Sequence, residues 1–545
     1  MSHRHTITFF ALSLSIGLAG CPTEPGSDAG LDAPATIDVP EGEEDTGLDG
    51  GQTDEDAGHD GGSDGGGNDA PDLGCGDPSD RPVVVIDADI TANTTWTCDN
   101  IYEIDQVRYV AAATGLATLT IEPGTLIRGE PPVFDAGGAV IELPGALVVS
   151  RTGRLVAEGT EAEPIVFTSA TAPGSRLAGD WGGLVLLGRA PNNVAGGLAR
   201  LEGLPLTAGA RGRFGVDLAA GETFEPSWNC GSLRYVRVEY AGFVLADSKE
   251  LNGITLGSCG TDTRLSYVQI HVGLDDGIEF FGGASDVDHL VITGAQDDGI
   301  DWDNGFTGRI QFAVVQQYRG AGINNDSNGI EADNDPTGSA LTPLSEPRIF
   351  NLTLIGTSDG MNLAGLRLRR NTRGFVANAI VTGFAGGSVD IDDDTTIAAA
   401  TSMSGLDRLV VRNIIAEQSV LSPPSGTWWA TDSDALVEAT HFLMSGLMNR
   451  ETTTGSPPTV FPDPLAYVSP GWVPVAGSTP ASGAVAPGEA FDATCEPACA
   501  ASEVCRLGAC LPAFFDASAT YVGAFEPGGP AVTDWSRGWT TTDPD

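Results

Sequence analysis

The segments DDGIEFFGG (Asp275–Gly283) and QDDGIDWDNG (Gln296–Gly305) decide the fold, because the second repeats the pattern of the first 22 residues later. The same pattern, a polar or small residue followed by Gly, an aliphatic residue and then alternation, recurs in NGITLG, NGIEADN and AGLRLRR. The glycines of these five segments lie at positions 253, 277, 299, 329 and 365. Their spacing indicates a structural repeat of about 22 residues with insertions.

A second recurring segment lies between these glycine-containing segments. Examples are LRYVRVEYAG (233–242), LSYVQIHVG (265–273) and DHLVITG (288–294). Short runs rich in Val, Ile, Leu and Tyr, separated by Gly, Asn and Asp, predict an all-β fold. Two strand types that alternate along one repeat favour a parallel β-helix, in which each strand pairs with its copy in the next turn. A propeller or a pair of sandwiches is the alternative, but the two-residue hairpin turns they need are rare here.

Four segments carry a resemblance to a known family: GDWGGLVLLG (Gly179–Gly188), YVRVEYAG (Tyr235–Gly242), and the two segments quoted first. Through them, residues 84–420 resemble the right-handed parallel β-helix proteins of the pectin-lyase-like type. More closely, they are similar to uncharacterised bacterial surface lipoproteins. The resemblance implies the fold but brings no established activity, because the wider fold includes lyases, hydrolases and adhesins.

The charge is unevenly distributed along the chain. The formal net charge is −47, and residues 22–80 contain 18 Asp or Glu, 14 Gly and no Lys or Arg. Such a segment cannot bury enough apolar surface to fold, so we predict a disordered tether over residues 21–80. We predict a β-helix over 81–420 and a C-terminal capping region over 421–545, with a Cys-rich insertion at 495–510. In the capping region, Trp428, Trp429, Trp535 and Trp539 are expected to seal the end of the β-helix, and Ala519–Phe525 to form a late strand there. Nucleic-acid binding is excluded, because phosphate contacts need clustered basic residues.

The N-terminus has the pattern of an export signal. Arg4 precedes an apolar run that ends in Leu-Ala-Gly-Cys at Cys21, which predicts a signal peptide over residues 1–20. The ending resembles the lipobox of bacterial lipoproteins, and this resemblance implies cleavage before Cys21 and lipidation of its sulfur and amine. Several acyl chains give stable anchoring. We therefore expect a monomeric protein that is anchored to the outer membrane by its lipid and exposed at the cell surface.

The remaining cysteines predict disulfides, because their number is even and the protein is expected to be exported. Proximity suggests the pairs Cys75–Cys98 and Cys230–Cys259. The pairing among the last four cysteines stays open. A zinc site is the alternative for those four, but their spacing lacks the paired C-x2-C of a zinc ribbon. The four form a C-x3-C-x5-C-x4-C pattern: Cys495, Cys499, Cys505 and Cys510.

The aligned repeats predict a stack of acidic side chains. Asp276, Asp298 and Asn328 fall at one corner of successive turns. If the isoleucines that follow point inward, the period-two alternation of a strand points the next residues outward. This predicts an outer ligand-binding face that consists of Glu279, Asp301, Asp303, Glu331, Asp333, Arg367 and Arg369. Trp302 has the inward parity of a core residue.

Stacked carboxylates repel, so something should offset the repulsion. Calcium is one candidate, with Asp275, Asp276, Asp297 and Asp298 as ligands, because Ca²⁺ prefers carboxylate and carbonyl oxygens. The nearby arginines and protonation of one acid, as in a catalytic pair, are the others. The simplest alternative is that these are solvated corner residues that cap turns through their own backbone.

Two functions are compatible with these features. The first, which we favour, is a non-enzymatic surface protein that binds polysaccharide or another surface component. The second is a polysaccharide lyase or glycoside hydrolase that acts on acidic or cell-surface glycans. No Ser-His-Asp set and no phosphate-binding Gly loop can be assembled from the motifs.

Overall fold

The computed structural model describes residues 75–246, 249–318, 327–357, 364–402, 408–417, 429–430, 434–452, 470–474, 483–487, 499–500, 503–506, 509–528, 534–542 and 545. Every described residue belongs to one compact unit, Ala70–Asp545. The predicted signal peptide, the lipidation site Cys21 and most of the predicted tether lie outside the described residues.

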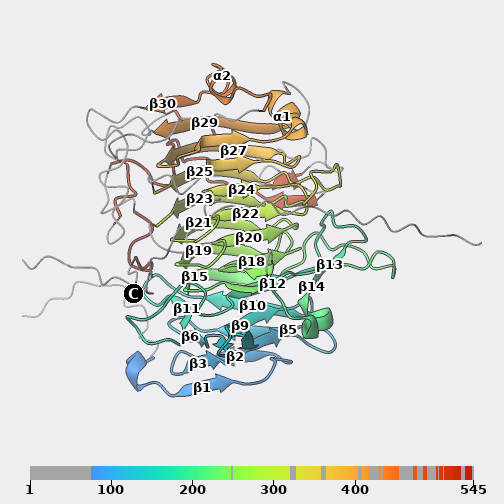
Figure 1. Ribbon diagram of the computed structural model, residues 1–545, viewed down its shortest axis with the longest axis vertical. Coiled ribbons are helices and arrows are strands. Elements are labelled where there is room, and N and C mark those ends of the chain that lie inside the picture. The colour runs from blue at the N-terminus through green and yellow to red at the C-terminus, as the bar shows by residue number, and fades with distance from the viewer. Residues whose placement is uncertain are drawn as a thin grey trace, which may run out of the picture. The chain divides into compact units, whose positions relative to one another are not determined.

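Two parallel sheets stack the chain turn upon turn, so the predicted parallel β-helix is confirmed (Figure 1). The first, sheet B, has nine strands: β4 (Val107–Val110), β9 (Ala146–Val149), β12 (Leu184–Leu187), β18 (Ile254–Gly257), β20 (Ile278–Phe281), β22 (Ile300–Asp303), β24 (Ile330–Ala332), β26 (Ala364–Leu368) and β28 (Gly387–Ile391). The predicted inward residues Ile278, Ile300 and Ile330 are aligned in register and fully buried.

The second, sheet A, has fifteen strands: β1 (Val83–Ile86), β2 (Thr94–Trp96), β3 (Ile101–Ile104), β5 (Ala117–Ile121), β6 (Leu126–Gly129), β10 (Gly153–Glu158), β11 (Ile165–Ser169), β15 (Gly231–Glu239), β19 (Arg264–His271), β21 (Asp286–Thr293), β23 (Arg309–Gln316), β25 (Arg348–Ile355), β27 (Gly374–Thr382), β29 (Leu409–Glu417) and β30 (Arg450–Thr452). The last strand, β30, lies beyond residue 420, where we expected the β-helix to end.

The glycine of each repeat is required by the close approach of neighbouring turns. A Cβ at Gly253, Gly277 or Gly299 would lie 2.7 Å from the carbonyl oxygen of the glycine in the next turn. Real Cβ atoms do not approach a carbonyl oxygen that closely. The repeat that identified the fold is thus a row of positions where two backbones leave no room for a side chain.

Sheet A bends at a second row of residues. The long strands carry a left-handed residue near their middle, where the pairing register skips one position: Tyr235, Tyr267, His289, Phe312, Asn351, Asn378 and Asn413. In β15, the residues before this position pair with β10 and those after it pair with β11. Each turn therefore has three strand segments, and this row, which we call the left-handed corner, joins two of them.

The core is a column of stacked aliphatic and aromatic side chains between the sheets. Trp302 is 1% exposed and belongs to this core, as its parity predicts. Its indole Nε1 donates a hydrogen bond of 3.0 Å to Thr372 Oγ1, so the one polar atom of the ring is satisfied.

Residues from the C-terminal quarter lie along the left-handed corner. Trp539 packs edge-on against Tyr235 and Tyr267, and Asn378 Nδ2 donates to the carbonyl oxygen of Val485. We expected Trp535 and Trp539 to seal the end of the β-helix, and this is wrong for both, because they cover its side.

The strand expected over Ala519–Phe525 is also absent from this part of the described chain. Its backbone instead bonds to the corner, as when Ala524 N donates to Thr353 Oγ1. Trp429, in contrast, lies in the core and stacks on Phe442, while its neighbour Trp428 is outside the described residues.

Short helices and two-stranded sheets lie outside the two long sheets. They are η1 (Pro78–Asp80), β7 (Val133–Phe134), β8 (Val140–Glu142), β13 (Leu198–Arg200), η2 (Leu206–Gly212), β14 (Arg213–Gly215), β16 (Phe243–Ala246), β17 (Lys249–Leu251), α1 (Asp394–Thr401), α2 (Glu438–Phe442), β31 (Glu503–Arg506) and β32 (Ala509–Pro512). Among the described residues, no helix combines the length and apolar character that a membrane span requires.

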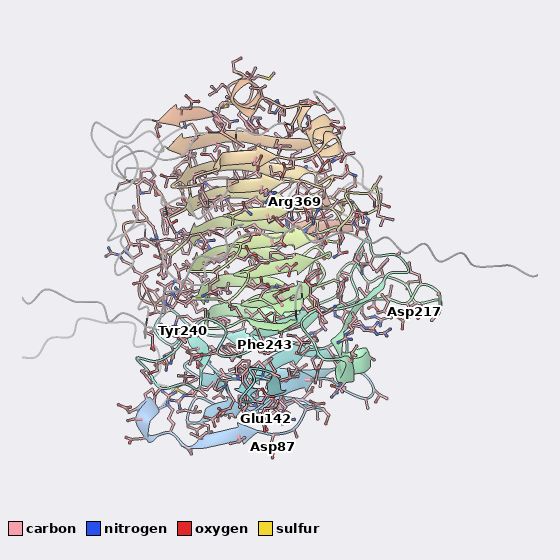
Figure 2. All side chains as sticks on the ribbon, in the orientation of Figure 1. Asp87, Glu142, Asp217, Tyr240, Phe243 and Arg369 are labelled. Atoms are coloured by element: carbon pink, nitrogen blue, oxygen red, sulfur yellow. A yellow bond between two sulfur atoms is a disulfide. The ribbon has the colours of Figure 1, made fainter. Side chains whose placement is uncertain are left out.

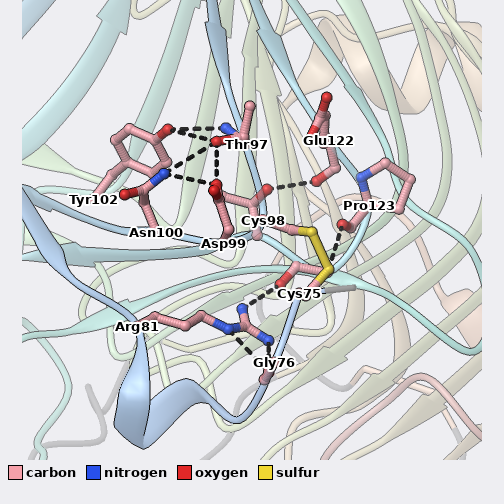
Figure 3. The surroundings of a disulfide bond; sticks show 12 residues. Cys75, Gly76, Arg81, Thr97, Cys98, Asp99, Asn100, Tyr102, Glu122 and Pro123 are labelled. Atoms are coloured by element: carbon pink, nitrogen blue, oxygen red, sulfur yellow. Dashed lines mark hydrogen bonds between the residues drawn. A yellow bond between two sulfur atoms is a disulfide. The ribbon is translucent and has the colours of Figure 1, made fainter. Parts of the chain in front are cut away.

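Disulfides link segments that lie 11 to 29 residues apart in the chain. The predicted pairs Cys75–Cys98 and Cys230–Cys259 are confirmed, and Cys499 pairs with Cys510. Cys505 is also disulfide-bonded, and Cys495 lies outside the described residues. Figure 3 shows how the first bridge, with Arg81 bonded to the carbonyl oxygen of Gly76, fastens the start of the described chain to the β-helix.

Candidate functional site

The corner that precedes sheet B carries a ladder of polar side chains. Asp276 Oδ1 accepts a hydrogen bond of 2.9 Å from the backbone N–H of Asp298, and Asp298 Oδ1 accepts one from the N–H of Asn328. Asn328 Oδ1 continues the series by accepting from Ala364 N at 3.1 Å. The predicted stack of Asp276, Asp298 and Asn328 is therefore present, and each member caps the next turn.

The alternative of solvated corner residues is wrong in one respect. Asp276 is 7% exposed and Asp298 is 5% exposed. Their hydrogen bonds go to the next turn of the β-helix and not to their own backbone. The stacking itself buries these acids, because each one lies between two neighbouring turns.

The predicted outer residues are in register on the outer side of sheet B. Glu279 pairs with Asp301, which pairs with Glu331, which pairs with Arg367. Glu279 is nevertheless buried, and its Oε2 accepts a hydrogen bond of 2.6 Å from Asn252 Nδ2. This face is thus partly covered, which the alternation of the strand could not indicate.

Two groups of three carboxylates offer oxygens that lie within 4.8 Å of one another. One group is Asp275, Asp276 and Asp297; the other is Asp276, Glu279 and Asp301. We call these five residues the acidic cluster. Within it, Asp301 Oδ1 is buried and has no hydrogen-bond partner in the described part of the chain. Asp298, which we also expected among cation ligands, belongs to neither group.

Burial and mutual repulsion raise the pKa values of these acids. Burial, followed by the charge of Asp297, raises the pKa of Asp275 to about 8. Burial is also the largest cause for Asp276, Glu279 and Asp301, whose pKa values lie well above the ordinary range. Without a compensating cation, the folded protein therefore holds protons here near neutral pH.

Arginines neutralise the next turns. Arg369 pairs with Glu331 and, at 3.0 Å, with Asp333, and Arg370 pairs with Asp333 at 2.6 Å. Arg367 pairs with Asp392 at 3.1 Å. Figure 2 labels Arg369 among the upper strands of the β-helix. The predicted arginine compensation is thus present, but for one end of the acidic face only.

Glu331 and Asp303, two acids of that face outside the acidic cluster, differ in their surroundings. Burial raises the pKa of Glu331 to about 7 although Arg369 lowers it, and burial raises the pKa of Asp303 to about 7. Asp303 Oδ1 accepts a hydrogen bond from the N–H of Asn304. Asp303 and Asp333 extend the acidic face beyond the acidic cluster, toward the arginines.

Three residues of the site escaped prediction. Asn252 donates a hydrogen bond to Glu279 and accepts one from the N–H of Asp276. It precedes Gly253 in the same polar-residue–Gly pattern that predicted the other turns, so this pattern could have identified it. Glu202 and Glu250 add negative charge that raises the pKa of Asp275. Both lie outside the repeat, so no spacing could have indicated them.

The chain was compared with known proteins. Residues 88–433 match the family model described as a pectate-lyase like beta helix domain. The match includes all strands of sheet B and therefore the entire acidic face. No curated protein and no solved structure matches the chain.

The capping role of Asp298 predicts a difference between two substitutions. Asp298→Asn keeps an acceptor for Asn328 N–H, whereas Asp298→Ala leaves that buried donor unpaired, which costs about 1–3 kcal/mol. We expect the Ala variant to be less stable than the Asn variant by that amount in chemical denaturation at pH 7 with EDTA. Equal stability of the two variants would contradict the capping role.

The raised pKa values predict the pH dependence of stability. The folded state retains protons that the unfolded chain releases above its ordinary Asp and Glu pKa values of 3.8 and 4.5. In EDTA, the free energy of unfolding should therefore fall as pH rises from about 4 through about 8. Denaturation at several pH values measures this, and Asp275→Asn should weaken the fall. A stability that rises between pH 5 and pH 8 would contradict the assignment.

Proposed function

The chain belongs to the pectate-lyase-like β-helix family, and from this premise we propose that it binds polysaccharide through a divalent cation held by the acidic cluster. The observation that carries the proposal is the uneven compensation of charge. In the described residues, arginines pair with Glu331, Asp333 and Asp392, but none forms an ion pair with Asp275, Asp276 or Glu279.

The donor set fits a hard cation. All members of the acidic cluster offer carboxylate oxygens, which Ca²⁺ prefers, and the buried Asp301 Oδ1 has no hydrogen-bond partner among the described residues. Asp275, Asp276, Asp297, Glu279 and Asp301 would hold the ion, which when bound supplies positive charge for oxygens of a ligand. Cation binding would replace the protons held by these acids, so affinity should increase with pH.

A second candidate function, glycan hydrolysis, is favoured by one observation. Two carboxyl groups about 5 Å apart are the arrangement of a retaining glycosidase, and oxygens of Asp276, Glu279 and Asp301 lie within 4.8 Å of one another. However, Asp276 and Glu279 are each 7% exposed and already accept hydrogen bonds. A buried, engaged carboxylate is poorly placed to attack a polymer, so binding is the better supported function.

Calorimetry on the full chain tests the cation site. After dialysis against EDTA, CaCl₂ should bind more tightly at pH 8 than at pH 5.5, and Asp301→Asn should weaken binding by about 10-fold or more, since an ionised ligand is lost. Asp262→Asn, at an exposed acid, is the matched control and should leave the affinity unchanged.

The same samples test the ligand. Retention on immobilised acidic polysaccharides should require calcium and should be lost in Asp301→Asn. The proposal would be overturned if the protein bound neither calcium nor any of the polysaccharides. Release of reducing ends without unsaturated ends from the polysaccharide would instead establish hydrolysis, the second candidate.

We further propose that the protein is lipid-anchored at Cys21, with the acidic segment as a tether to the outer membrane. The support is the Leu-Ala-Gly-Cys sequence after an apolar run. Mass spectrometry of the mature protein should find an N-terminus at Cys21 that carries a diacylglyceryl group. Cys21→Ser should move the protein out of the membrane fraction, and an unmodified mature N-terminus elsewhere would contradict the anchor.

A further inference from the structure

Two adjoining cavities lie beside the first strands of sheet B, away from the strands of the acidic cluster. Their volumes are about 280 and 530 Å³, and both are lined by Asp89 and Arg211. The chain between β12 and β15 forms one wall through Arg211 of η2, and the turns after β4 and β9 form another. The larger cavity has the size of a small-molecule site.

Arginines from three separate elements line the larger cavity. Arg151 follows β9, Arg189 follows β12, and Arg211 belongs to η2. The chain has only 27 basic residues against 74 acidic ones. The lining of the larger cavity has three arginines against two acids, Asp89 and Glu222, and so keeps a formal charge of +1 on a strongly acidic protein.

Of the three arginines, Arg151 is the one that the nearby acids satisfy least, because Arg211 pairs with Asp89 and Arg189 Nε donates to Glu225 Oε1 at 2.8 Å. Glu222 Oε2 lies 3.5 Å from Arg151 Nη1 and 3.8 Å from Arg189 Nη2, and it also accepts from Asp217 N at 2.9 Å. Figure 2 labels Asp217 on the outer side of this region. One oxygen thus serves two guanidinium groups at long range, and good charged hydrogen bonds are shorter.

Arg151 has a further unmet donor. Its Nε is buried without a hydrogen-bond partner in the described chain, while its Nη1 donates to the carbonyl oxygen of Gly215. Burial lowers the pKa of Arg151, and the charges of Arg189 and Arg213 lower it further. Arg211, paired with Asp89, lies over the Tyr109 ring at 4.1 Å.

We propose that this cavity binds a tetrahedral oxyanion, such as the sulfate or phosphate ester of a sugar. Such a group offers three or more oxygens, so it can accept hydrogen bonds from guanidinium groups that approach from different elements. A carboxylate has two oxygens, which a single arginine can satisfy. The hydroxyl groups of Thr91 and Thr152, which also line the cavity, suit sugar hydroxyls.

Calorimetry in EDTA tests this site separately from the cation site, because no divalent ion is then available. The probes are glucose 6-phosphate, N-acetylglucosamine 6-sulfate and galacturonate, with the full chain at low and at physiological salt. One or both of the first two should bind, with affinity that falls as salt rises. The tighter-binding of these two probes shows whether the cavity prefers a phosphate or a sulfate ester. Galacturonate should bind at least 10-fold more weakly than that probe.

Substitutions locate the site. Arg151→Gln and Arg189→Gln should each weaken binding about 10-fold or more, as the loss of a charged hydrogen bond predicts. Arg537→Gln, at an exposed arginine paired with Asp534, is the matched control and should bind like the unaltered protein. Because Arg151 also bonds to Gly215 and Arg189 to Glu225, thermal unfolding must verify that both variants fold. The proposal is overturned if neither ester binds, if galacturonate binds equally well, or if Arg189→Gln retains full affinity.

Discussion

The structure depends on the close contact between successive turns at the glycines of the repeat. Since a Cβ at Gly277 or Gly299 would lie 2.7 Å from the next glycine's carbonyl oxygen, the chain can stack here only without a side chain. This contact sets the register of sheet B. It thereby aligns the inward isoleucines in the core and the polar residues that precede the glycines at the corner.

The same register creates the electrostatic problem of the acidic face. Once the glycines are stacked, Asp276 must lie above Asp298, and Glu279 beside Asp301. The β-helix compensates part of this charge with hydrogen bonds along the corner and another part with arginines on β26 and just after it. In the acidic cluster, Asp276 and Glu279 each accept a hydrogen bond, but no arginine of the described residues forms an ion pair with Asp275, Asp276 or Glu279. The raised pKa values of the cluster follow from that geometry, because burial and repulsion act on acids that the fold cannot separate.

Periodicity predicted the features that repeat with the turn: the parallel β-helix, the inward isoleucines, the buried Trp302 and the acidic stack. It could not predict burial on the outer face, because Glu279 is held by Asn252 of the preceding turn. The left-handed corner was also missed. Its residues have no common chemistry, changing from aromatic in the earlier strands to asparagine in the later ones, and they resemble ordinary strand residues in the sequence. Trp535 and Trp539 were misplaced for the same reason, since the aromatic stack they cover was not recognised.

The positions of uncompensated charges are more informative about ligand sites than the net charge of the chain. A net charge of −47 does not by itself indicate any binding site. The acidic cluster and the arginine-lined cavity share one property: each holds a buried polar atom with no hydrogen-bond partner in the described parts of the chain, Asp301 Oδ1 in the first and Arg151 Nε in the second. Leaving such an atom unpaired costs stability, so a native structure retains it most readily where a ligand completes the pairing. The two atoms have opposite chemistry, an acceptor and a donor, and for this reason they indicate two different ligands, a cation and an anion, on one β-helix.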